Sequence, residues 1–197
     1  MRKICTVLLL SLLTACSFAP RDTGTSFMFA LQPAKVIQQG AGSEDLIIFM
    51  PTTSPELDTY RIALNGNGTR WDYYAGARWA DFLPLLVQDN MTKTLAQARI
   101  FKSVSTGDSG LTGNKILKTE IRAFQAEYAA GSAVPVVKIS MAITLVSRLE
   151  RVPLASFTLE AKKKASGDSL SAIQTAFAAA FNGAQQQLIE KLRVINK

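Results

Sequence analysis

The chain has 197 residues, carries a formal net charge of +7 and contains no histidine. Its length fits one ordinary domain, and its 48% content of hydrophobic residues is too high for a disordered chain. Without histidine, Ser-His-Asp and Cys-His catalysis, histidine-ligated zinc and a histidine proton shuttle are excluded, and two cysteines cannot build a thiolate metal cage. The composition therefore disfavours an enzyme and a metal centre.

Residues 1–15 have the pattern of a secretory signal peptide. One arginine and one lysine precede the apolar run 4–13, which is half the ~20 residues that a membrane-spanning helix needs. The next residues complete the pattern Leu-Thr-Ala-Cys, which resembles the bacterial lipobox, in which the cysteine is acylated and the signal is removed just before it. We therefore predict cleavage between Ala15 and Cys16, with lipid attached to Cys16.

A plain signal peptide cleaved after Ala15, which would leave Cys16 as a free thiol, is the alternative. We favour acylation because an unpaired exposed thiol is a liability in an oxidising compartment. Loss of residues 1–15 removes two positive charges and lowers the net charge from +7 to +5. The mature chain then has one cysteine, so that no intrachain disulfide can form.

The residues that follow the cysteine suit a lipidated tether. Segment 16–26 is small, polar and proline-containing, which is typical of a flexible linker. In Gram-negative bacteria the residue after the acylated cysteine largely decides the membrane. By resemblance to that sorting rule, Ser17, which is not aspartate, indicates the outer membrane.

The predicted domain, 27–197, begins with strands. The apolar run 46–50, which a proline follows, is typical of a strand buried on both faces. Segments 59–64 and 69–74 flank Asn65-Gly66-Asn67-Gly68. Because asparagine and glycine tolerate positive φ, we expect a hairpin there.

A helix is predicted next, because apolar residues recur at three- and four-residue steps over 79–101. A proline at position 84 is tolerated in a first turn, so we expect the helix to begin at Phe82 or Leu83. Asp81 is the expected N-cap.

The second half of the chain is predicted to be rich in strands. Residues 103–113 are a flexible loop by composition, 117–128 are extended, and 136–147 alternate most clearly between apolar and polar side chains. A turn at 148–153 leads into an antiparallel partner strand at 154–162.

The last predicted element is an alanine-rich amphipathic helix at 170–192, capped by Asp168 or Ser169. The adjacent antiparallel strands before it have one apolar side, which a second layer must cover. We therefore expect an α+β fold, a mainly antiparallel sheet with two long amphipathic helices packed on one face as a two-layer sandwich.

The charged residues show no pattern for catalysis or for nucleic-acid binding. The carboxylates have no spacing that suggests a pair for acid-base chemistry, although a fold can assemble one from distant residues. Lysines 162–164 are usually a solvated strand end, and contact with anionic lipid headgroups is the alternative. No basic stripe interleaved with aromatic residues is present, so we expect no nucleic-acid partner.

Segment 71–86 contains a strand that ends in aromatic residues, then Arg78-Trp79-Ala80-Asp81, then a proline and leucines that continue a helix. This arrangement resembles the ABC-type transport auxiliary lipoproteins, including the paraquat-inducible protein C type. The lipobox, the chain length and the late alanine-rich helix agree with the resemblance.

The resemblance implies a non-enzymatic component of an envelope lipid transporter, without a cofactor of its own. Such systems combine an ABC permease, a cytoplasmic ATPase and an MCE-domain protein that carries lipid across the periplasm. The lipoprotein would dock the far end of that conduit at the outer membrane, facing the periplasm. A homo-oligomer is expected by analogy with related secretion lipoproteins that form rings.

Aromatic residues around this motif are of the types that anchor interfaces. Trp71, Tyr73 and Tyr74 are candidates, whereas Trp79 begins the apolar stripe of the helix and is expected in the core. Strand alternation is expected to turn one of the two tyrosines inward, and Arg78 can also pair within the fold. From this segment we take Tyr73, Tyr74 and Arg78 as the candidate partner contacts.

Two other functions are kept as alternatives. A ring-forming lipoprotein of a polysaccharide or fibre secretion channel would need an amphipathic element that inserts into the membrane, and the sequence shows none clearly. A periplasmic hydrolase or ligand-binding lipoprotein would need a pocket with convergent polar groups.

Overall fold

The computed structural model describes residues 26–36, 42–66 and 70–196. The predicted signal peptide, Cys16 and all but the last residue of the tether lie outside the described residues. In chain order the elements are β1 (Phe27–Phe29), β2 (Asp45–Ile48), β3 (Thr52–Thr53), β4 (Arg61–Gly66), β5 (Arg70–Trp79), α2 (Leu83–Ala98), β6 (Ser103–Thr106), β7 (Lys115–Tyr128), β8 (Val136–Ser147), β9 (Pro153–Lys164) and α3 (Leu170–Ile195).

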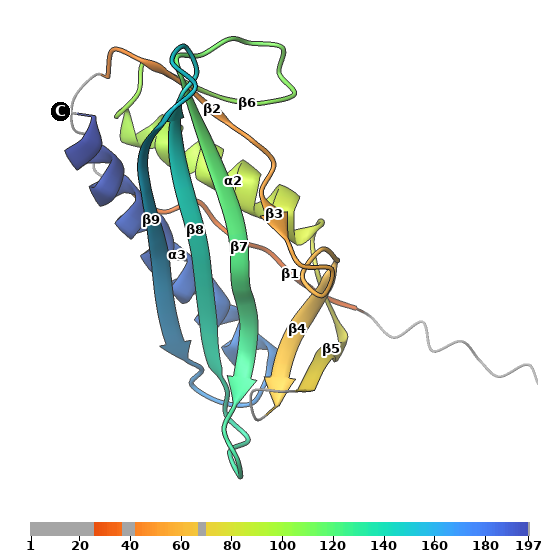
Figure 1. The fold of residues 1–197 in the computed structure, drawn as a ribbon. Helices are drawn as coiled ribbons and strands as arrows, with labels where there is room; N and C mark the ends of the chain where they lie inside the picture. The colour runs from red at the N-terminus through yellow and green to blue at the C-terminus, as the bar shows by residue number, and fades with distance from the viewer. Residues whose placement is uncertain (1–25, 37–41, 67–69, 197) are drawn as a thin grey trace, which may run out of the picture.

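The strands form one twisted sheet, and both helices lie on the same face of it (Figure 1). The two-layer α+β arrangement is therefore as predicted. The opposite face of the long strands β7, β8 and β9 has no helix over it in Figure 1. Its side chains are largely polar or charged, as expected for a sheet face toward water.

The long strand β7 has antiparallel and parallel neighbours. On one edge it pairs antiparallel with β8, from Lys115 opposite Ser147 to Glu127 opposite Val136. On the other edge it pairs with β2, β3 and β4, which follow one another along it and run parallel to it. β1 with β5 and β2 with β6 are also parallel pairs. The sheet is therefore mixed. Its long pairs are antiparallel, as predicted, and the short parallel pairs were not predicted.

The direction of pairing follows from how the strands are connected. After β4 the hairpin strand β5 and then α2 carry the chain back to the end of the sheet where β2 begins. β6 and β7 therefore start there and run parallel to β2 and β4, whereas a hairpin reverses the chain. The hairpins β4–β5, β7–β8 and β8–β9 are accordingly antiparallel. Apolar alternation reports which face a side chain takes and contains no information about strand direction.

The predicted flexible loop at 103–113 begins as a strand. β6 pairs in parallel with β2, from Asp45 opposite Ser103 to Ile48 opposite Thr106, and the Ser103 hydroxyl donates a hydrogen bond to the Asp45 carboxylate (2.6 Å). The sequence did not predict this strand, because its serine and threonine side chains do not form the apolar pattern of a buried strand. The strand forms because α2 returns the chain beside the free edge of β2, which offers a complete ladder of backbone partners.

Helix α2 begins at Leu83, as predicted, but Asp81 is not its N-cap. The N-cap is Phe82, and the Asp81 carboxylate accepts a hydrogen bond from the backbone N–H of Phe82 (2.8 Å), one position too early to cap the helix. The helix ends at Ala98, because Arg99 takes a left-handed conformation with φ of 51°.

The N-cap of helix α3 is Ser169, one of the two residues that the sequence predicted. The Ser169 hydroxyl accepts a hydrogen bond from the backbone N–H of Ala172 (3.3 Å), which satisfies one of the free donors of the first turn. The helix continues to Ile195, three residues beyond the predicted end.

The core lies between the sheet and the two helices and is rich in aromatic rings. Trp79 is fully buried, as predicted, and meets Phe29, Phe124 and Phe177 edge to face, with its ring centre 5.1 Å from that of Phe177. The sheet, the first strand and α3 are thus joined around one indole ring.

A buried amide fastens the segment after β1 to the helices. Gln185 of α3 has no exposed surface, and its Nε2 donates to the backbone carbonyl of Gln32 (3.1 Å). Its Oε1 accepts from the hydroxyl of Thr94 on α2 and from the backbone N–H of Ala34 (3.4 Å). The chain that follows the predicted tether is therefore held against both helices.

Candidate docking surface

Tyr73 and Tyr74, both predicted partner contacts, lie next to each other on β5, and both are half-buried. Simple alternation fails because β5 bulges against β4. Residues 74–77 lie opposite the single residue Ile62, and Gly76 has a φ of +67°, which glycine adopts without strain.

Both tyrosine hydroxyls have partners inside the fold. Tyr73 donates to the backbone carbonyl of Glu56 (3.1 Å), and the Arg61 guanidinium lies 3.8 Å from the centre of its ring. The Tyr74 and Tyr128 hydroxyls are 2.8 Å apart, and burial together with this hydrogen bond raises the pKa of Tyr74. The two hydroxyls therefore connect β5 to the segment before β4 and to the end of β7. A partner could reach only parts of the two rings.

Arg78 is the most accessible of the three predicted contacts. It lies opposite Met28 of β1 and Arg61 of β4, and its side chain is exposed. Its guanidinium forms no ion pair with any residue that the structure describes. Its charge is therefore open to an acidic group of a partner.

An apolar groove beside the Arg-Trp-Ala-Asp motif was not predicted. It has a volume of about 490 Å³. The residues that line it are Met50, Pro51, Thr52, Thr53, Asp58, Phe82, Pro84 and Leu85. We call it the Phe82 groove.

The backbone around the Phe82 groove is firmly placed. The N–H of Trp79 donates to the carbonyl of Tyr60 (2.7 Å), and the N–H of Leu83 donates to the carbonyl of Thr59 (3.3 Å). These bonds bring the Tyr60 ring to 3.9 Å, centre to centre, from the Phe82 ring. The aromatic pair is exposed at the surface and yet held by the motif that precedes the helix.

Sequence periodicity misassigned Phe82. Its position at a three-residue step from Trp79 placed it on the buried stripe, but as the N-cap it precedes the first helical turn and points away from that stripe. The sequence does contain a signal for its exposure. Phe82 follows Asp81 and lies two residues before Pro84, where a helix is expected to begin, and a residue that precedes the first turn does not follow the helical period.

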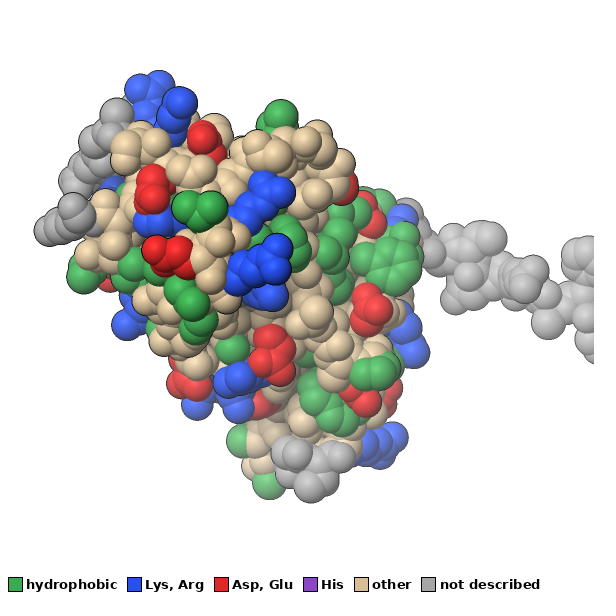
Figure 2. Space-filling view, turned by 45° about the horizontal axis from the view of Figure 1, so that its top comes forward, with side chains coloured by type: hydrophobic (Ala, Val, Ile, Leu, Met, Phe, Trp, Pro, Cys, Tyr) green, Lys and Arg blue, Asp and Glu red, His purple; other side chains and the backbone are tan. Residues whose placement is uncertain are grey.

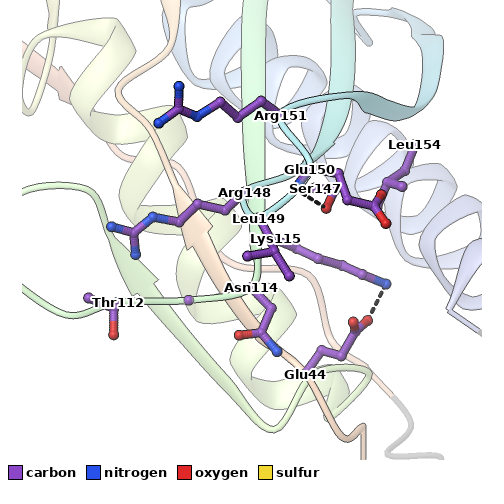
Figure 3. A pocket seen from close by; sticks show the side chains of 11 residues that line it. Glu44, Thr112, Asn114, Lys115, Ser147, Arg148, Leu149, Glu150, Arg151 and Leu154 are labelled. Carbon is purple, nitrogen blue, oxygen red and sulfur yellow. Dashed lines mark hydrogen bonds and ion pairs between the residues drawn. The ribbon is translucent and has the colours of Figure 1, made fainter.

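A larger concave region, about 800 Å³, lies at the end of the sheet where the β8–β9 turn meets the segment before β7 (Figure 3). Lys115 projects into it and forms an ion pair with Glu44, and its Nζ also donates to Asn196 Oδ1 (2.7 Å). Arg148 and Arg151 extend to the other side of the turn in Figure 3.

Within residues 26–36, 42–66 and 70–196, no group of three or more histidine, cysteine, aspartate or glutamate side chains is arranged to hold a metal ion. None of the helices in those ranges is long and apolar enough to cross a membrane.

A family model matches residues 29–192, from the last residue of β1 through the Arg-Trp-Ala-Asp motif and the Phe82 groove to nearly the end of α3. Its description is ABC-type transport auxiliary lipoprotein component. The chain belongs to this family. This match confirms the resemblance to the auxiliary lipoproteins that the segment around Arg78 and Trp79 indicated. No curated protein matches the sequence.

Solved structures share the fold of this auxiliary lipoprotein. A protein of the DUF330 family from Xanthomonas campestris has a TM-score of 0.77 at 20% identity, over 85% of this chain and 95% of that chain. An uncharacterized protein has a TM-score of 0.63 at 11% identity, over 81% and 99% of the two chains. The PelC dodecamer of Paraburkholderia phytofirmans reaches a TM-score of 0.40 at 12% identity, over 79% and 94%. At that value the assembly of PelC says nothing about this chain.

Proposed function

We propose that this auxiliary lipoprotein is a non-enzymatic part of an envelope lipid transporter. Acylated at Cys16, it sits in the outer membrane, faces the periplasm and docks an MCE-domain protein, through which it is coupled to an ABC permease and ATPase. The observation that supports this most is the family match over 29–192. The lipobox that ends at Cys16 supports the lipid anchor. We also propose a homo-oligomer, which is the expectation that comes with the family resemblance in the sequence.

We place the docking surface at the Phe82 groove and the neighbouring Arg78. The groove presents an exposed aromatic ring above an apolar floor, which is the kind of anchor point that contributes most to protein interfaces. The arginine adds an unpaired charge beside it. Near the groove the Glu56 carboxylate, whose pKa the hydroxyl of Ser54 lowers further, adds a negative charge that can select a partner's basic groups.

The test is the recovery of the MCE-domain protein with the acylated chain from detergent-solubilised envelopes. Phe82→Ser and Arg78→Glu should each lower recovery about tenfold, because both alter exposed side chains at the centre of the proposed surface. The matched controls Val194→Ser and Lys163→Glu alter exposed side chains elsewhere and should recover as much as the wild type.

The outcomes test the docking surface and the transport function separately. If the MCE-domain protein is recovered equally with all four variants, the surface is wrong and the function stands. If the wild-type chain recovers no transporter subunit, the transport function is wrong. Recovery of the chain alone as a large homo-oligomer would favour a secretion ring instead.

A further inference from the structure

The turn between β8 and β9 exposes an apolar side chain at its tip. Leu149 is 90% exposed. The backbone N–H of Ser147 donates to the carbonyl of Val152 (2.9 Å), and that of Arg151 donates to the carbonyl of Ser147 (2.9 Å). Arg151 has a left-handed φ of 60°, which is uncommon for a residue with a side chain. The leucine is therefore presented by a closed, well-defined turn.

A second exposed leucine lies on the neighbouring loop. Leu111, in the segment between β6 and β7, is 63% exposed. The backbone N–H of Arg148 donates to the carbonyl of Asn114 (2.9 Å), which ties the hairpin tip to the end of that loop. Figure 2, in which this end of the sheet comes forward, shows separate apolar side chains among basic and acidic ones.

Two arginines flank Leu149, and their charges are not used within the described fold. Lys115, the other cation here, is occupied by Glu44 and Asn196. Arg148 and Arg151 form no ion pair with any residue in the described ranges, and both extend away from the Lys115–Glu44 pair in Figure 3. Two guanidinium groups therefore stand free beside a protruding leucine.

We infer that this end of the sheet is a second membrane contact, in which Leu149 and Leu111 enter the bilayer interface while Arg148 and Arg151 bind phosphates of anionic phospholipids. The planar guanidinium matches a phosphate with two parallel hydrogen bonds. Both leucines are largely exposed, and Leu149 also borders the concave region in Figure 3. Exposed apolar side chains beside basic ones suit insertion among headgroups. We call this end the Leu149 tip.

The inference rests on the lipid anchor of the proposed function. Phe27 is the eleventh residue after Cys16, and an extended chain of eleven residues spans about 36–40 Å at most. The anchor therefore confines the domain near the bilayer, and a contact that is weak by itself is enough to orient it.

The other basic cluster lies at the far end of the same strand. Lysines 162–164 end β9, and their partners on β8 are Val136, Val137 and Lys138, none of which is an exposed apolar side chain. A basic cluster without protruding apolar groups is typical of a solvated strand end. Of the two ends of β9, the Leu149 tip is the one built to enter a membrane.

The experiment uses the acylated chain in vesicles of phosphatidylglycerol and phosphatidylethanolamine in equal amounts. A nitrobenzoxadiazole dye is attached through Glu150→Cys at the Leu149 tip or through Ala130→Cys at the β7–β8 turn, which lies at the opposite end of the sheet. Acylated Cys16 has no free thiol and stays unlabelled. The readout is quenching of the dye by spin-labelled lipid.

We expect the dye at position 150 to be quenched about fivefold or more above the dye at position 130. Leu149→Ser, and the pair Arg148→Glu with Arg151→Glu, should each lower quenching at 150 to the level at 130. The matched pair Lys162→Glu with Lys163→Glu should leave it unchanged. Replacing both lipids with phosphatidylcholine should reduce it.

Equal quenching at the two positions, stronger quenching at 130, or no effect of the tip variants would overturn the inference. The Leu149 tip would then not enter the membrane, and a protein partner could bind it instead. Flotation of the same vesicles tests the anchor separately. A chain that floats without quenching at the tip contradicts this inference alone, whereas a chain that does not float contradicts the lipid anchor and the inference together.

Discussion

Trp71 and Trp79 lie on the same strand, eight residues apart, and strict alternation would place them on the same face. Trp71 is 39% exposed, whereas Trp79 is fully buried. The bulge at residues 74–77 explains the difference, because it adds an odd number of residues between them and turns the later part of β5 over. The bulge therefore decides which aromatic side chains reach the surface.

The hydroxyl pair of Tyr74 and Tyr128 makes stability sensitive to alkaline pH. Burial, and then the hydrogen bond with Tyr128, raises the pKa of Tyr74 above its ordinary value of 10.0. The unfolded chain loses this proton near pH 10 while the folded chain keeps it. Its contribution to the free energy of unfolding is therefore fully present below pH 10 and is lost as the pH rises further.

Tyr74→Phe should remove part of that alkaline loss. We expect a cost of about 0.5–1.5 kcal/mol at neutral pH from the lost hydrogen bond, and a shallower decline above pH 10. Urea unfolding at neutral and alkaline pH measures both. Tyr60→Phe, at an exposed tyrosine, is the control, and a decline as steep as in the wild type would show that Tyr74 is not the titrating group.

At the scale of elements, β9 pairs with β8 alone, so its outer edge needs protection against pairing with other chains. Helix α3 supplies it. Gln187 accepts a hydrogen bond from the backbone N–H of Glu160 (3.3 Å) and donates one to its carbonyl (2.8 Å). The side-chain amide thus occupies the donor and acceptor that another strand would use.

Gln187→Ala should open this edge. We expect a loss of about 0.5–1.5 kcal/mol in the free energy of unfolding and a concentration-dependent increase in mass measured by light scattering. The control is Gln186→Ala, whose side chain donates its hydrogen bond to the backbone carbonyl of Lys35, outside β9. Self-association that is equal in both variants would count against edge protection by Gln187.

At the scale of the whole molecule, the proposed lipid anchor would join the folded domain to the membrane. Acyl chains add ~0.8 kcal/mol of membrane affinity per buried methylene. The domain meets the tether at β1, whose last ring contacts Trp79 in the core, and Gln185 holds the following segment against both helices. The proposed anchor would thus be connected to the buried core through β1.

Cys16→Ser should abolish both acylation and removal of residues 1–15. Mass spectrometry of the N-terminus should show the wild type beginning at an acylated Cys16 and the variant retaining the signal. Cys5→Ser is the matched control, because that cysteine leaves with the signal and its loss should change nothing. If Cys16→Ser is still cut after Ala15, a plain signal peptide is the correct interpretation.

The sequence by itself determined the elements that depend on neighbours along the chain. The start of α2 at Leu83, the Ser169 cap and the alternating strand at 136–147 were all predicted, because helix turns, caps and hairpins are made by residues close in sequence. The family resemblance rested on one short segment around Arg78 for the same reason, since the strand end, the motif and the helix start are contiguous there.

Only the tertiary structure decided the features that are formed by segments far apart in the sequence. The parallel pairing of β2, β3 and β4 along β7 and the strand β6 are products of the return of the chain through β5 and α2. Of the candidate site, sequence reasoning found Arg78 and the two tyrosines but not the Phe82 groove, which is formed where the segment after β2 meets the start of α2. Local patterns specify which face a side chain prefers, whereas strand direction, bulges and grooves are set by which segments meet across the fold.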